Sequence, residues 1–168
     1  MTIETKHTVM KGMNMTGGTK PTANTDALSI LKKDHRDVEN AFTEYEKLSP
    51  KDSLEKRKSL ADHIGKELLT HMAIEEDVFY PAIKKRVKGA EEAVNEGVVE
   101  HANAKDVIKQ IKKMKGDEEL FDAKVKVLNE LIEHHVDEEE KVMFPKVEDS
   151  DIDLEALGRE MSDYKTKR

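Results

Sequence analysis

The sequence predicts an all-α protein: an up-down-up-down four-helix bundle with a short C-terminal helix. Three observations lead to this fold class. Charged residues make up 39% of the 168-residue chain and aromatic residues only 4%, a composition typical of long solvated helices. Apolar residues recur at alternating steps of three and four along four long segments, as on one face of a helix. Short breaks join these segments, as between antiparallel neighbours in a bundle.

A capping or breaking residue precedes each expected helix. These positions are Thr25 or Asp26, then Ser49-Pro50 with Asp52 or Ser53, then Gly89, then Gly116-Asp117, and Asp153 before a last helix that ends near Tyr164. They divide the chain into a flexible tail over residues 1–25, a bundle over residues 26–147 and a C-terminal segment over residues 148–168. The short last helix is expected to pack outside the bundle or against one end of it.

The composition excludes several classes of function. A net charge of -7 argues against binding to nucleic acid or to an anionic membrane. The absence of cysteine excludes disulfides, thiolate nucleophiles and thiolate metal sites. No apolar run has the length of a signal peptide or a membrane span, so a cytoplasmic location is expected.

Each of the four long helices carries a histidine on its apolar face, and two of them carry a glutamate one turn further on. These residues are His35, His71, Glu75, His101, His135 and Glu139. Burying one unpaired polar group costs a few kcal/mol, and an unpaired charge costs more. A bundle with a stability on the order of 10 kcal/mol cannot bury six such groups unless something compensates them. One or two bound cations would do so, and the six residues are therefore predicted metal ligands.

A repeated phrase supports this prediction. The segments HMAIEEDVFYP, from His71, and HVDEEEKVMFP, from His135, share a His-x-x-x-Glu and a proline at the same offsets. Residues four apart lie on one helix face with an axial offset of about 6 Å, so each pair can approach one site. Val78 and Val142 are expected to continue the buried faces. Each proline is expected to bend or end its helix.

Other polar residues compete for the same roles. His63 and Glu67 also form a His-x-x-x-Glu, but they lie one position off the apolar face. His134 and Glu138 are likewise off that face, so His134 is expected to flank the site or to be solvated. Three further carboxylates, Glu76, Glu138 and Glu140, are interpreted as a solvated face. Ala102 and Ala104 beside His101 are expected to leave a narrow opening for a small ligand.

At these residues the sequence resembles the hemerythrin-like family, named for its His-His-Glu cation-binding domain. The resemblance implies a four-helix bundle around two iron ions. These ions are expected to be oxo- or hydroxo-bridged and to bind or react with dioxygen, peroxide or nitric oxide. Iron is favoured over manganese and zinc. The chain departs from oxygen-carrying members in two places: Lys105 replaces a second histidine of the third helix, and Glu139 follows His135 by four residues where they have Asp five residues on.

These departures shift the expected function away from plain reversible oxygen carriage. With one histidine fewer, more metal coordination positions are open to a substrate. The first hypothesis is therefore a di-iron protein that binds or reacts with a small oxidant or gas, with catalase-like peroxide decomposition as one form of it. The alternative is a non-enzymatic iron or oxygen sensor, which requires a protein partner, or an iron-handling protein. A bundle without metal is the third hypothesis.

Overall fold

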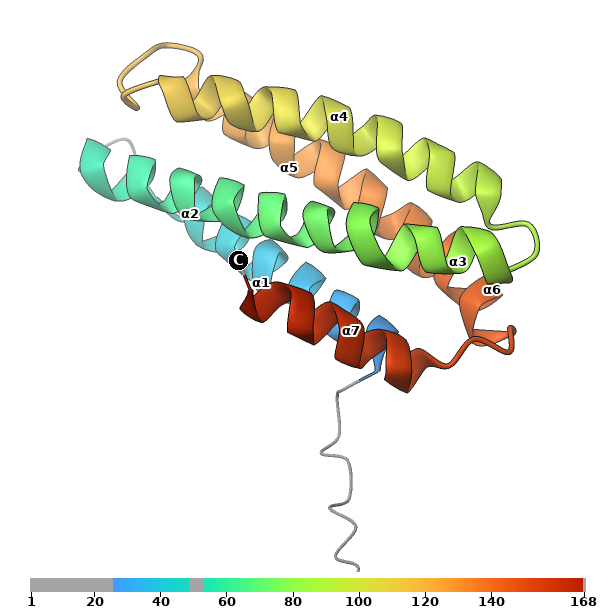
Figure 1. Cartoon of the computed structure of the whole chain (residues 1–168). Coiled ribbons are helices and arrows are strands. Elements are labelled where there is room, and N and C mark those ends of the chain that lie inside the picture. Colours follow the sequence, from blue (N-terminus) through green and yellow to red (C-terminus); the bar gives the residue numbers. More distant parts are fainter. Residues whose placement is uncertain (1–25, 49–52, 168) are drawn as a thin grey trace, which may run out of the picture.

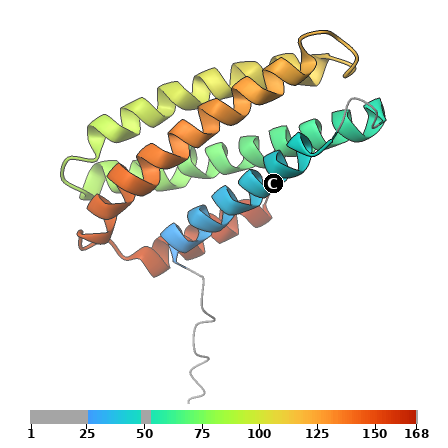
Figure 2. The same ribbon diagram turned by 180° about the vertical axis from the view of Figure 1, so that it is seen from behind.

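The computed structural model describes residues 26–48 and 53–167, and these residues form an all-helical bundle without strands (Figure 1). The elements are α1 (Ala27–Glu46), α2 (Leu54–Ile74), η1 (Glu75–Phe79), α3 (Tyr80–Arg86), α4 (Glu91–Lys113), α5 (Phe121–Glu138), η2 (Glu139–Met143), α6 (Phe144–Glu148) and α7 (Leu154–Thr166). The long helical segments are α1, α2 with η1 and α3, α4, and α5 with η2 and α6. They lie side by side (Figures 1 and 2). The predicted fold class is confirmed. The predicted flexible tail, residues 1–25, lies outside the described residues.

The helix starts follow from side chains that satisfy exposed backbone N–H groups. Asp26 accepts a hydrogen bond from the Ser29 N–H, Ser53 accepts one from Lys56, and Asp153 accepts one from Ala156. These are the cap positions expected for the first, second and last helices. No helix in the described residues is long and apolar enough to cross a lipid bilayer.

A π-helical turn interrupts each repeated phrase, and the sequence did not predict it. The turns η1 and η2 begin at Glu75 and Glu139, and the N–H groups of Tyr80 and Phe144 bond to the carbonyls of these glutamates five residues back. A proline follows each turn, at Pro81 and Pro145, where it has no N–H to offer the α-helical pattern. Each proline is expected from the sequence to bend or end its helix nearby, and the helices continue a short way past it: α3 ends at Arg86 and α6 at Glu148.

The core consists of two apolar clusters, one on each side of a polar layer in the bundle. One cluster includes Val38, Leu68, Ile108 and Ile132, and the other includes Phe79, Phe144 and residues of α7. Between them lie His35, His71, Glu75, His101, His135 and Glu139, all less than 6% exposed. The apolar clusters therefore exclude water from both sides of a buried charged layer.

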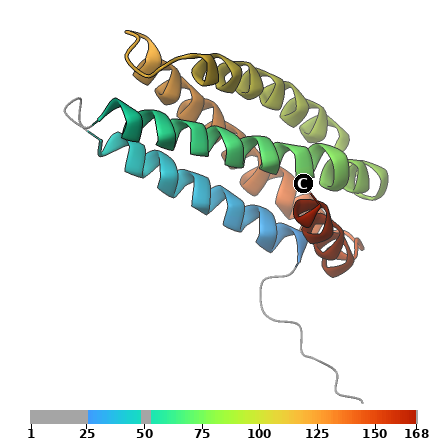
Figure 3. The same ribbon diagram turned by 60° about the vertical axis from the view of Figure 1, so that its left-hand side comes forward.

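Helix α7 breaks the symmetry of the bundle. It packs against α1, α2 and η1, on the outside of the bundle (Figure 3). Leu157 and Met161 of α7 join the cluster that buries Val78, which is 7% exposed. Nothing equivalent covers η2 among the described residues, and Val142 is 39% exposed. The expectation that Val142 is buried is therefore wrong, because helical phase alone does not show whether a further helix covers a face.

Candidate metal centre

The four histidines and two glutamates come together from four helices. The Nε2 atom of His35 lies 3.2 Å from Glu139 Oε2, and that of His135 lies 3.7 Å from the same oxygen. The Nε2 atoms of His71 and His101 lie 3.2 and 3.3 Å from the two oxygens of Glu75. Each carboxylate thus faces one histidine from the first half of the chain and one from the second.

These donors divide into two groups, each able to hold one cation. The first group is His35, His71, Glu75 and Glu139, and the second is Glu75, His101 and His135. Within each group, one donor atom per residue lies within 4.8 Å of the others. Glu75 belongs to both groups, as expected of a carboxylate that bridges two metal ions. The Nε2 atoms of His101 and His135 lie 3.1 Å apart, a spacing that one shared cation accounts for.

Buried atoms without hydrogen-bond partners indicate that the donor set fits a metal. Within the described residues these atoms are His35 Nε2, both ring nitrogens of His71, both oxygens of Glu75 and Glu139 Oε2. Leaving a buried polar group unsatisfied costs about 1–3 kcal/mol, and a charged group costs more. Imidazole and carboxylate are ligands for iron, manganese and zinc. A cation in each group would therefore satisfy the atoms that the protein itself does not.

The other ring nitrogen of each histidine faces a second carboxylate. His35 Nδ1 lies 2.8 Å from Glu140 and His101 Nδ1 lies 2.9 Å from Glu76. His135 Nδ1 lies 2.8 Å from Glu100. Such carboxylates would fix each ring with Nε2 toward a bound metal and would raise the basicity of the ligand.

The fourth histidine, His71, also faces a second carboxylate, but at a longer distance. Its Nδ1 lies 3.8 Å from Asp34. The interpretation of Glu76 and Glu140 as a solvated face is wrong, because both are half-buried against histidines of other helices. The sequence placed them on the exposed side of their own helices and contained no signal for those partners.

The arrangement has an internal two-fold symmetry. Asp34-His35 corresponds to Glu100-His101, and His71, Glu75 and Glu76 correspond to His135, Glu139 and Glu140. A basic side chain contacts each outer carboxylate: Lys165 contacts Asp34, Lys105 contacts Glu76, Arg36 contacts Glu140, and the exposed His134 lies 3.3 Å from Glu100. Lys105, at the position where the oxygen carriers have a histidine, thus supports a carboxylate of the site.

The electrostatics of the buried layer shift its pKa values strongly. Burial alone lowers the pKa of His71, but the charges of Glu75 and Glu139, with the polar interaction of Asp34, outweigh burial and raise that pKa to about 10. Burial alone raises the pKa of Glu75, but His71 and His101 outweigh it and lower that pKa well below its usual value. Without a metal, pairing between imidazolium and carboxylate groups, at His71 above all, therefore stabilises the layer.

One position breaks the symmetry inside the site. Tyr80 and Phe144 occupy equivalent places, and they stack on His101 and His35 with ring centroids 5.5 and 5.9 Å apart. Only Tyr80 of the two carries a hydroxyl, which donates to Glu139 Oε1 at 2.9 Å. Burial and the charges of Glu75 and Glu139 raise the pKa of Tyr80, so the phenol stays protonated and remains a donor.

Gly97 on α4 makes room for this hydroxyl. A Cβ atom at Gly97 would lie 2.7 Å from the Tyr80 hydroxyl oxygen. We expect Gly97→Ala to destabilise the protein by about 1–3 kcal/mol, as overpacking does. In a Tyr80→Phe background the same change is expected to cost less, because the oxygen 2.7 Å from the added Cβ is gone and only the ring carbon Cζ at 3.3 Å remains close. The higher helix propensity of alanine acts in the same direction.

A double-mutant cycle of thermal unfolding measures this coupling. The free energies of unfolding of the two single variants and the double variant are compared with that of the parent. Additive effects of the two substitutions would contradict the close contact between Gly97 and Tyr80.

The competing histidines are outside the two donor groups, although His134 contacts the outer carboxylate Glu100. His63 is exposed and belongs to neither of the two donor groups, and the side chain of His134 is 64% exposed. Sequence reasoning missed the roles of Tyr80 and Gly97. Tyr80 lies in the repeated phrase HMAIEEDVFYP, but only the packing of α3 against α4 shows that its hydroxyl points into the site.

Comparisons with known proteins concern the family and the fold of this chain. A family model described as the hemerythrin HHE cation binding domain matches residues 26–147. A search of curated proteins found no match. Among solved structures, the crystal structure of a hemerythrin HHE cation binding domain-containing protein, the Rv2633c homolog from Mycobacterium kansasii, is 26% identical with a TM-score of 0.69. The match covers 84% of this chain and 88% of that chain.

Proposed function

Because this chain belongs to the hemerythrin HHE cation-binding domain family, we propose that it holds two iron ions and binds or reacts with a small oxidant or gas. The candidates are dioxygen, hydrogen peroxide and nitric oxide. The observation that carries the proposal is the pair of buried donor groups that share Glu75. The proposed ligands are His35, His71, Glu75, His101, His135 and Glu139.

The donor set leaves coordination positions for a ligand. Four imidazoles and two carboxylates supply fewer donor atoms than two octahedral ions accept, even when both carboxylates bridge. When bound, iron supplies one-electron redox chemistry and open positions where a small molecule can bind. The protein supplies the dry surroundings and fixes the imidazoles through the outer carboxylates.

A small cavity beside the site favours a small ligand. It measures about 10 Å³ and is lined by His35, His71 and His135 together with Asp34 and apolar side chains. The apolar lining residues are Val38, Leu68, Met72, Ile132 and Val136. A cavity of this size has room for about one water-sized molecule. A diatomic gas or a peroxide is compatible with such a space, and a larger organic substrate is not.

Metal analysis and optical spectra test the proposal together. We expect about two iron ions per chain, as in other metal sites built inside helical bundles. A near-ultraviolet to visible band is expected to change on addition of peroxide, azide or nitric oxide. Peroxide consumption with release of dioxygen would support the catalase-like form, whereas a spectral change without consumption would support the sensing alternative. A purified chain that binds no metal would refute the proposal.

A further inference from the structure

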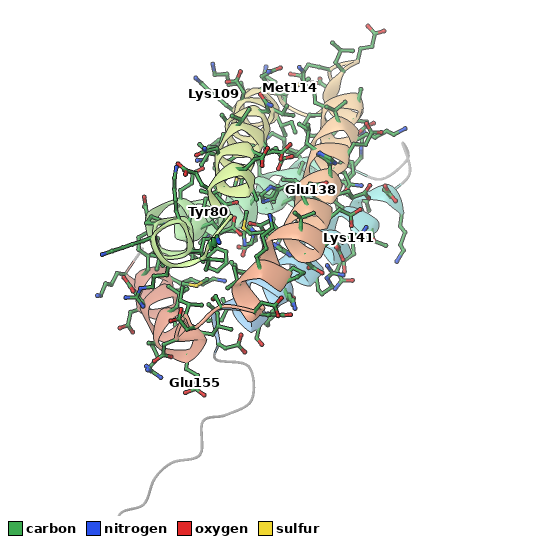
Figure 4. All side chains as sticks on the ribbon, turned by 90° about the vertical axis from the view of Figure 1, so that its right-hand side faces the viewer. Tyr80, Lys109, Met114, Glu138, Lys141 and Glu155 are labelled. Atoms are coloured by element: carbon green, nitrogen blue, oxygen red, sulfur yellow. The ribbon has the colours of Figure 1, made fainter. Side chains whose placement is uncertain are left out.

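A groove between α4 and η2 leads from the surface to the candidate metal centre. We call it the α4–η2 groove and define it by Glu92, Glu96, Gly97, Glu138, Val142 and Lys146. The cavity measures about 90 Å³ and reaches His135 and Glu139 at its inner end. Figure 4 views the bundle from the end where α3 connects to α4, and it labels Glu138 on α5. Glu92, Glu96 and Val142 are exposed, so the groove opens to solvent.

The inner end of the groove presents an unsatisfied buried oxygen. Glu139 is 1% exposed and lines the cavity, and its Oε2 has no hydrogen-bond partner in the part of the chain that the structure describes. His135, which is 3% exposed, lines the same end. A molecule that passes through the groove therefore meets two donors of the proposed centre.

The internal symmetry of the bundle predicts a second groove, between α1 and η1, and there the residues differ. Ile30 and Leu31 replace Glu96 and Gly97, and Ile74 and Ala82 replace Glu138 and Lys146. These four apolar residues belong to, or pack against, the cluster that contains Leu157 and Met161 of α7. Helix α7 therefore covers this position and fills it with side chains.

The charge of the open groove indicates what it admits. Glu92, Glu96 and Glu138 line its outer part, and Glu100 and Glu139 line it beside His135. Lys146 is the one lysine or arginine among the lining residues that the structure describes. A cleft lined by one sign of charge between low-dielectric walls raises the local concentration of ions of the opposite sign and increases their association rates. Carboxylate oxygens are also ligands that iron(II) and similar divalent cations accept.

We propose that the α4–η2 groove is the entry route for divalent metal cations to the buried centre. Helix α7 seals the symmetry-related route, so loading proceeds past Glu92, Glu96 and Glu138 to Glu139 and His135. This inference rests on the proposed function, because it requires a metal centre at the inner end of the groove.

Metal loading kinetics test the entry route. Co²⁺ is added to metal-free protein, and its visible absorption is followed by stopped flow at low ionic strength. The triple variant Glu92→Gln, Glu96→Gln, Glu138→Gln is expected to load about tenfold more slowly. The final metal content should equal that of the parent, because none of the three is a proposed ligand. The difference should shrink as added salt screens the charges.

Two further variants make the test specific. A matched triple variant removes three exposed carboxylates elsewhere, at Glu55, Glu119 and Glu130, and is expected to load at the parent rate. Lys146→Gln removes the opposing charge and is expected to load faster than the parent.

The possible outcomes distinguish the proposed entry route from the proposed metal centre. Equal rates for the groove variant and the parent, or equal slowing in both triple variants, would overturn the entry route and leave the metal centre intact. A parent protein that takes up no Co²⁺ or iron would instead refute the centre, and the route with it.

Discussion

The Glu75→Gln variant is expected to lose most of its bound metal from both positions. Glu75 is fully buried and is the one residue that belongs to both donor groups in the described part of the chain. An amide keeps the shape of the side chain but carries no negative charge, and it cannot bridge two cations through two anionic oxygens. Loss of an outer partner of a ligand already weakens metal binding by about 10–100-fold, so loss of a bridging ligand should exceed that range.

The competing motif on the same helix provides the matched control. His63 and Glu67 repeat the His-x-x-x-Glu spacing two turns earlier but lie outside both donor groups. Metal content measured after purification should therefore stay at the parent level in His63→Ala and in Glu67→Gln. If Glu75→Gln kept its full metal content, or if Glu67→Gln lost as much, the assignment of Glu75 as the bridging ligand would be wrong.

Metal removal is expected to change how stability depends on pH. In the metal-free protein the pKa of His71 is raised to about 10 from an ordinary value of 6.5. A raised histidine pKa stabilises the folded state fully below pH 6.5, and this stabilisation is lost as the pH rises through about 10. The metal-free protein should therefore lose on the order of a few kcal/mol between neutral pH and pH 10, since each pKa unit corresponds to about 1.4 kcal/mol.

The metal-loaded protein should behave differently over the same range. Metal ions bind neutral imidazoles, so metal binding becomes more favourable as the pH rises. A ligand at 1,000 times its dissociation constant stabilises by about 4 kcal/mol, which corresponds to roughly 10 °C in melting temperature for a chain of this size. We expect the gap between loaded and metal-free melting temperatures to be larger at pH 9 than at pH 6.

Thermal unfolding followed by circular dichroism, with and without metal, measures this gap. Metal-free Glu75→Gln serves as the control, because without the carboxylate charge the pKa of His71 should rise less and the loss of stability with pH should be shallower. A gap that stays constant from pH 6 to pH 9 would show that the imidazolium–carboxylate pairs do not hold the metal-free layer together.

The sequence determined the helices and the residues that turn inward. Steps of three and four residues report which face of one helix is apolar, and they placed His35, His71, His101 and His135 on such faces. The same periodicity placed Glu75 and Glu139 one turn further on. The structure buries all six. Their role as ligands stays a prediction that metal analysis tests.

Only the tertiary structure decided how the helices meet. Glu76 and Glu140 lie off the apolar face of their own helices, yet they contact histidines on α4 and α1. Helix α7 covers Val78 but leaves Val142 open, although both occupy the same place in the repeated phrase. The physical reason is that periodicity describes a single helix, whereas contacts between helices depend on how each helix is placed along and around its neighbours. That placement is set by packing over the whole bundle.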